Sequence, residues 1–215
     1  MTSQSDWAIY NEVFANGDYD PAIQMALERA TGSGELTILD LGANVGFFTL
    51  RCEELSRRQS RPPSLHVTAV EGNPNTFREL QTRLYEENHL STVKAIDGVV
   101  GERSGTAAIS DREFSGQNEV GTDESKKQFV MKYVDLEEVV EAGMIGLPKC
   151  DIEGSELRFL RNYPQLLQRT DVAAVELHPD KCDANECVAL LTAAGLARSS
   201  VLIQNPLVRL MHFWR

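Results

Sequence analysis

The sequence predicts an α/β protein with a doubly wound, mostly parallel sheet. Short apolar runs alternate along the chain with segments that carry apolar side chains at helical spacing. Glycine, asparagine and proline separate the two kinds of segment. Strands that alternate with helices pair in parallel through right-handed crossovers, so the carboxyl ends of the strands meet at one edge of the sheet. Ligands of such sheets bind at this edge, where the strand order switches direction.

Aromatic side chains at helical spacing mark the first expected helix. Trp7, Tyr10 and Phe14 lie three or four positions apart, and Asp20-Pro21 then opens a second helix. We expect the aromatic side chains either to pack on the core or to form a lid over a substrate pocket. The expected division of the chain is a helical cap, residues 1–30, and a ligand-binding domain, residues 31–215.

The next elements alternate strictly between strand and helix. An apolar run ends at Gly42, and helical spacing follows it. A β-branched run is then followed by Asn73-Pro74, where asparagine suits the N-cap and proline suits the first helical position. The expected elements are a strand at 36–41, a helix at 46–58, a strand at 66–70, a helix from 74 to about 88 and a strand at 93–96.

The second half continues this alternation after one polar stretch. The segment 110–127, between two short strands, is rich in polar residues and is expected to be a mobile loop near the ligand. Pro164 is expected to break or bend a helix, and Asn205-Pro206 suits a hairpin turn. The expected elements are strands at 106–109 and 129–134, a helix at 136–142, a strand at 147–150, a helix at 155–168, a strand at 172–177, a helix at 184–194 and strands at 197–204 and 207–214.

The charge balance excludes several classes of partner. Lys and Arg number 21 and Asp and Glu number 32, so the net charge is −11 at pH 7. Nucleic acids and anionic membranes would be repelled, which leaves a small molecule as the expected substrate. Neither a secretion signal nor an apolar stretch of about 18 residues is present, so we expect a cytoplasmic location. The oligomeric state is left open, a homo-oligomer included.

A glycine loop follows the first of these strands. Gly42 and Gly46 permit a tight turn and let a ligand approach the backbone in front of a helix N-terminus. The third glycine of a G-x-G-x-x-G pyrophosphate loop is missing, because Phe47 stands at that place. A pyrophosphate ligand is therefore disfavoured. Asp40, just before the loop, is expected either to face the ammonium group of an amino-acid moiety or to bond loop amides.

Acidic residues end the next two strands. Glu71 stands about 25 positions after Gly46, a spacing at which a carboxylate can accept hydrogen bonds from both hydroxyls of a ribose. Asp97 is expected either to meet an adenine edge or to cap a turn. Asp40 and Glu71 would then grip opposite halves of one ligand.

Four motifs lie at the ends of the expected strands: Asp40-x-Gly42-x-Asn44-x-Gly46-x-x-Thr49, Glu71-x-Asn73-Pro74, Asp97-Gly-Val-Val-Gly101-x-x-x-Gly105 and Lys149-Cys-Asp151-Ile-Glu153-Gly154-x-Glu156. Together they resemble the FkbM family of S-adenosylmethionine-dependent methyltransferases, and the last motif is the distinctive one. The resemblance implies a Rossmann-like, class I methyltransferase fold with seven strands, and methyl transfer to a hydroxyl of a sugar or small secondary metabolite. The cofactor contacts that it implies are Asp40, Gly42, Asn44, Gly46, Thr49, Glu71, Asn73 and Asp97.

The later strand ends carry acids and one imidazole that could converge near the transferable methyl group. A hydroxyl acceptor needs a base, which could be Asp151 or a neutral His178. The other solution is Mg²⁺ or another divalent ion, with Asp151, Glu153, Glu176 and His178 as candidate ligands. Lys149 is expected either as a third catalytic residue or as a buried ion-pair partner. The acids at the helix start could instead cap that helix.

Three functional hypotheses follow from the sequence. The leading one is O-methylation of a small hydroxylated molecule, with nitrogen or carboxylate acceptors as alternatives. The second is a nicotinamide-dependent oxidoreductase, which the glycine spacing disfavours. The third is a non-catalytic binding module, which the acids at the late strand ends disfavour.

Overall fold

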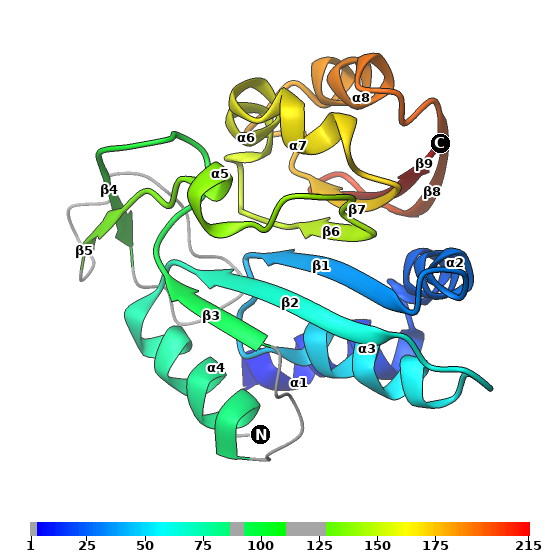
Figure 1. Cartoon of the computed structure of the whole chain (residues 1–215). Coiled ribbons are helices and arrows are strands. Elements are labelled where there is room, and N and C mark those ends of the chain that lie inside the picture. The colour runs from blue at the N-terminus through cyan, green and yellow to red at the C-terminus, as the bar shows by residue number, and fades with distance from the viewer. Residues whose placement is uncertain (1–3, 87–92, 111–127) are drawn as a thin grey trace.

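The computed structural model describes residues 4–86, 93–110 and 128–215. Within these ranges, seven strands form one sheet of order β3-β2-β1-β6-β7-β9-β8 (Figure 1). All neighbours from β3 to β7 pair in parallel, and β9 is antiparallel to both β7 and β8. The expected doubly wound, mostly parallel sheet is confirmed. The strands are β1 Glu35–Leu41, β2 Ser64–Glu71, β3 Val93–Asp97, β6 Leu147–Cys150, β7 Val172–Leu177, β8 Arg198–Gln204 and β9 Arg209–Trp214.

Helices cover both faces of the sheet (Figure 1). One face carries α1 Gln4–Tyr10, the π-helix η1 Asn11–Asn16, α2 Asp20–Ala30, α3 Phe47–Arg57 and α4 Pro74–Glu86. The other face carries α5 Leu136–Val139, α6 Glu156–Asn162, α7 Pro164–Gln168 and α8 Ala184–Ala193.

The central strands contribute side chains to two hydrophobic cores, because successive side chains of a strand point to opposite faces of the sheet. Ile38 packs in the core under α2, α3 and α4, whereas its neighbour Leu39 packs in the core under α6, α7 and α8. Ala174 and Val175 divide between the two cores in the same way. Burial on both faces explains why the parallel strands read as continuous apolar runs.

One helix is shorter than the sequence predicts, and another is divided in two at Pro164. The helix expected at 136–142 ends at Val139, because Val140 is already extended and Gly143 has a positive φ of 122°. The helix expected at 155–168 is interrupted as Pro164 predicted, since α6 ends at Asn162 and α7 begins at the proline.

A small second sheet stands beyond the carboxyl end of β3 (Figure 1). It consists of β4 Thr106–Ser110 paired antiparallel with β5 Gln128–Lys132. Ala107 and Ile109 pack there against Val99. Most of the polar segment 110–127 lies outside the described residues, so its role as a loop near the ligand stays a prediction.

The N-terminal helices pack on the main sheet. Tyr10 and Phe14 stack with ring centroids 5.0 Å apart, and both rings contact Phe47 edge-on, whereas Trp7 is 54% exposed. The packing role expected for this aromatic stripe applies to Tyr10 and Phe14. The division into a cap and a domain stays a prediction. In the described part of the chain, no helix combines the length and the apolar character that crossing a membrane requires.

Candidate active site

The strand order reverses direction between β1 and β6, and this switch creates the candidate site. β1 pairs with β2 on one side and with β6 on the other, so the loops that follow β1 and β6 leave the sheet next to each other. An open cleft lies at this edge, lined by residues of the loops that follow β1, β2, β3 and β6.

Gly42 makes the close approach of the two loops possible. Its φ is +75°, and a Cβ atom at this position would lie 1.8 Å from the backbone oxygen of Asp151. Its N–H and that of Ala43 donate to the oxygen of Val70 at 3.0 and 2.9 Å. Gly46, by contrast, precedes α3 away from the cleft, where a Cβ would meet Leu80. Only the first of the two glycines therefore lines the cleft.

Glu71 forms one end of the cleft. Its side chain is buried, and its two oxygens accept hydrogen bonds from the backbone N–H groups of Asn44 at 2.9 Å and Asn73 at 2.7 Å. Burial raises the pKa of Glu71 to about 7, although these two hydrogen bonds lower it. All three of these predicted cofactor residues line the cleft.

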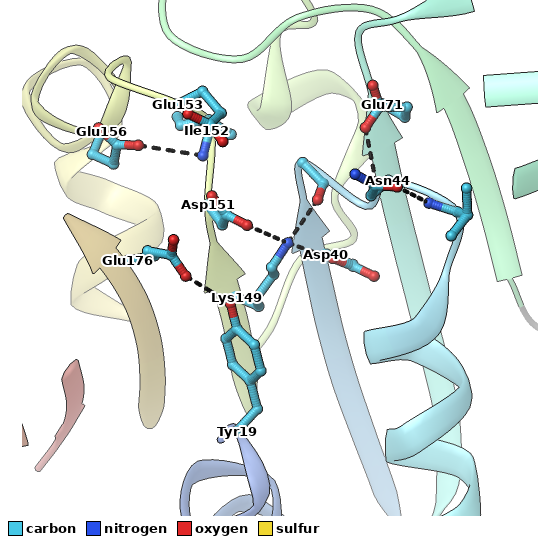
Figure 2. Close-up of polar contacts among 12 residues, drawn as sticks. Tyr19, Asp40, Asn44, Glu71, Lys149, Asp151, Ile152, Glu153, Glu156 and Glu176 are labelled. Atoms are coloured by element: carbon cyan, nitrogen blue, oxygen red, sulfur yellow. Dashed lines mark hydrogen bonds and ion pairs between the residues drawn. The ribbon is translucent and has the colours of Figure 1, made fainter. Parts of the chain in front are cut away.

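Asp40 and Thr49 lie behind the glycine loop rather than in the cleft. The Thr49 hydroxyl donates to Asp40 at 2.8 Å, and both side chains are buried. Lys149 stands between Asp40 and the cleft: its Nζ lies 3.6 Å from Asp40 Oδ1 and donates to the Gly42 oxygen at 2.6 Å (Figure 2). The charge partner of Asp40 is thus Lys149, a residue of the protein itself. The sequence had suggested either the ammonium group of a ligand or the amides of the loop.

Lys149 also reaches the opposite wall of the cleft. Its Nζ lies 3.5 Å from Asp151 Oδ2, so one ammonium group bridges β1, the glycine loop and the end of β6 (Figure 2). Burial by itself would lower the pKa of Lys149, but Asp151 and Asp40 raise it above its usual value. Lys149 is therefore charged, as expected for the ion-pair role.

Asp151 and Glu153 form the second end of the cleft, and His178 lies behind them. The Nε2 atom of His178 is 3.4 Å from Glu153 and 3.8 Å from Glu176. Its Nδ1 atom is 3.0 Å from Glu156. Burial lowers the pKa of His178, but the hydrogen bond with Glu156 and the nearby acids outweigh this and raise it to about 9. The strand ends thus bring together all four of the predicted metal-site residues.

Glu156, the first residue of α6, holds the loop that precedes this helix. Its Oε1 accepts a hydrogen bond from the backbone N–H group of Ile152 at 3.3 Å (Figure 2) and one from that of Gly154 at 2.9 Å. Asp151 and Glu153 instead pair with Lys149 and Lys181. Of the three acids, Glu156 is thus the one that bonds backbone amides, and these belong to the loop before α6.

Several residues of the site were not found by sequence reasoning. Tyr19, which precedes α2, donates from its hydroxyl to Glu176 at 3.1 Å (Figure 2), and no local pattern signals a contact across 157 positions. Val99 and Ile109 form an apolar wall of the cleft near Glu71. The exposed Asp97 ends β3 but does not line the cleft.

Comparisons with known proteins place the chain among methyltransferases. A family model described as the methyltransferase FkbM domain matches residues 40–197. The hexuronic acid methyltransferase AglP of Haloferax volcanii is 29% identical over 204 residues, which cover 92% of this chain and 77% of that protein. The METTL16 MTase domain shares the fold with a TM-score of 0.51 and 14% identity, over 94% of this chain and 65% of that one. WbdD gives a TM-score of 0.51 and 16% identity, over 94% of this chain but only 40% of its own.

Proposed function

The chain belongs to the FkbM methyltransferase family, and from this premise we propose that it transfers the methyl group of S-adenosylmethionine to a hydroxyl of a sugar or another small molecule. The observation that carries the proposal is a single cleft with a buried carboxylate, Glu71, at one end and two further carboxylates, Asp151 and Glu153, at the other. The first end suits a nucleoside, and the second suits an acceptor that must lose a proton.

The residues at the first end fit S-adenosylmethionine. Glu71 is held by two backbone N–H groups, and each of its oxygens keeps a lone pair with which to accept from a ribose hydroxyl. Val99 and Ile109 offer an apolar surface on which a base can pack. Gly42 lines the cleft between the two ends, where the amino-acid part would lie. When bound, this cofactor supplies an electrophilic methyl group on a sulfonium.

The residues at the second end would prepare the acceptor. We assign proton removal to Asp151, because it lines the cleft and one of its oxygens has no hydrogen-bond partner among the described residues. Lys149 holds the other oxygen, and His178 lies beside Glu153 rather than in the cleft wall, so both act as positioning residues. Much of the rate would come from holding the acceptor oxygen in line with the methyl group.

The acceptor class can be tested directly. Purified protein would be incubated with S-adenosylmethionine labelled in the methyl group and with hexoses, amino sugars and hexuronic acids. We expect the label in a product that resists mild base, as a methyl ether does. Label that mild base releases would indicate a carboxylate acceptor, label on nitrogen would indicate an amine acceptor, and either result would contradict the proposal.

Glu71→Gln is expected to weaken S-adenosylhomocysteine binding by about 10- to 100-fold. The amide places an N–H group against one of the two backbone donors, and loss of a charged hydrogen bond typically costs about 1.5–3 kcal/mol. Isothermal titration calorimetry measures the dissociation constant. Glu79→Gln, an exposed residue on α4, is the matched control and should bind as the wild type does. An unchanged constant in Glu71→Gln would remove Glu71 from the cofactor site.

Cofactor binding is also expected to depend on pH. The carboxylate form of Glu71 is the one that accepts from both ribose hydroxyls, and burial raises its pKa to about 7 against the opposing effect of Lys149. Below that pH the protonated form must lose its proton to bind, so the dissociation constant of S-adenosylhomocysteine should be roughly tenfold higher at about pH 6 than at about pH 8. Glu71→Gln should show no such difference, and a pH-dependent constant in this variant would assign the effect to another group.

A further inference from the structure

At the acidic end of the cleft, three side chains each place one possible metal-ligand atom close enough to the others for all three to bind the same cation. An oxygen of Asp151, an oxygen of Glu153 and a nitrogen of His178 all lie within 4.8 Å of one another. Metal–ligand bonds of about 2.0–2.2 Å place opposite ligands roughly 4 Å apart, so small side-chain rotations would bring all three atoms onto one ion.

The imidazole of His178 is already oriented for such a role. His178 is 4% exposed, and its Nδ1 atom is engaged at 3.0 Å by Glu156, which is itself fully buried. Two backbone N–H groups hold the same Glu156 oxygen, so this carboxylate cannot rotate freely. Nε2 therefore points at the acids. A carboxylate behind a histidine in this manner is the usual outer partner of a metal-bound imidazole.

Asp151, one of these three residues, has an oxygen that the described part of the protein leaves unpaired. Its Oδ1 atom is buried and has no hydrogen-bond partner among the described residues, while Oδ2 faces Lys149. A buried acceptor without a protein partner is a position at which a cation can bind.

Carboxylates outnumber lysines around these three side chains. Lys149 and Lys181 are the cations that face the group, at 3.5 Å from Asp151 and 2.9 Å from Glu153. Four carboxylates stand against these two ammonium groups and the imidazole, and burial raises the pKa of one of them, Glu176, to about 8. These carboxylates are Asp151, Glu153, Glu156 and Glu176.

We propose that Asp151, Glu153 and His178 bind one divalent transition-metal ion, of the class of Mn²⁺, Fe²⁺, Co²⁺ or Zn²⁺. Two carboxylate oxygens with one imidazole nitrogen suit these ions better than Mg²⁺ or Ca²⁺, which prefer oxygen ligands only. Glu176 is left out of the set, because among the described residues the ligand atoms that lie within 4.8 Å of one another are those of Asp151, Glu153 and His178. The catalytic consequence rests on the proposed function: with the ion bound, Asp151 would serve as its ligand, and the ion would take over from Asp151 the activation of the acceptor hydroxyl.

The test is a titration of chelator-treated, full-length protein with Mn²⁺, in which electron paramagnetic resonance measures the free ion. We expect one site that Zn²⁺ competes for and that a large excess of Mg²⁺ leaves occupied. His178→Gln and Asp151→Asn should each weaken Mn²⁺ binding at least tenfold, and Glu156→Gln should do so by about 10- to 100-fold through the orientation of the imidazole. His66→Gln, a histidine on β2, is the matched control and should bind as the wild type does.

The proposal would be overturned if the protein did not bind Mn²⁺. It would also be overturned if His178→Gln and Asp151→Asn both bound Mn²⁺ as the wild type does. The group would then be an ion-pair cluster around a protonated imidazole. S-adenosylhomocysteine binding is measured on the same samples. It reports that each variant is folded, and it separates the two proposals, because a protein that binds S-adenosylhomocysteine but not Mn²⁺ keeps the proposed cofactor site and lacks only the metal site.

Discussion

Asp151→Asn is expected to reduce kcat for methyl transfer by about a thousandfold while changing the dissociation constant of S-adenosylhomocysteine by less than about threefold. The amide keeps the size of the side chain but can neither take a proton from the acceptor nor carry the negative charge beside Lys149. Loss of a general base typically costs about 10²- to 10⁴-fold in rate. The measurement is single-turnover transfer of labelled methyl to the best acceptor.

Asp180→Asn is the matched control for this experiment. Asp180 is an exposed carboxylate at the same edge of the sheet, and its replacement should leave kcat unchanged. Lys149 keeps Asp40 as a charge partner in Asp151→Asn, so the variant should remain folded. If Asp151→Asn retained more than about a tenth of the wild-type rate, proton removal would have to be assigned elsewhere, with Glu153 as the next residue to replace.

Gly42→Ala is expected to weaken S-adenosylhomocysteine binding by more than about 100-fold. A methyl group at this position would overlap the backbone oxygen of Asp151, 1.8 Å from its Cβ, so the glycine loop and the end of β6 would have to separate. Such a shift would displace both ends of the cleft, and a loss of about 2.8 kcal/mol of contacts is enough for a hundredfold change in the dissociation constant. Calorimetry measures the affinity, and thermal unfolding reports the stability.

Gly34→Ala separates this steric effect from backbone strain. Gly34 has the same φ of +75°, but a Cβ there would meet no atom within 4 Å. Both variants carry the cost of a left-handed alanine, about 1–2 kcal/mol. Only Gly42→Ala should lose the ligand. Equal affinities in the two variants would show that contact between the loops does not shape the cofactor site.

The elements of the fold were predictable because their signals are local. Asn73 caps α4, as its position before Pro74 predicted, since its side-chain oxygen accepts from the N–H groups of Asn75 and Thr76. Pro164 separates α6 from α7 at the expected place. The alternation of strands and helices was enough to predict a parallel sheet and the edge at which its ligand would bind.

The roles of single residues in the site were harder to predict. The hypothesis that Asp40 and Glu71 grip one ligand from two sides placed both in the cleft, but only Glu71 lines it. Asp40 and Lys149 are paired residues on neighbouring strands that are more than a hundred positions apart in sequence. Their contact depends on β6 being the neighbour of β1, which no local pattern reveals. The family match in turn favours the methyltransferase over the nicotinamide-dependent oxidoreductase.

The amino-acid sequence alone determined the α/β class, the glycine loop, the acids at the strand ends and the resemblance to one enzyme family. These features depend on side-chain periodicity and on residues close together in the chain. The tertiary structure decided that Lys149 lies between Asp40 and Asp151, that Tyr19 reaches Glu176, and that His178 points its free nitrogen at two carboxylates. Those contacts join distant segments, and they exist only because the strand order brings their ends to the same edge of the sheet.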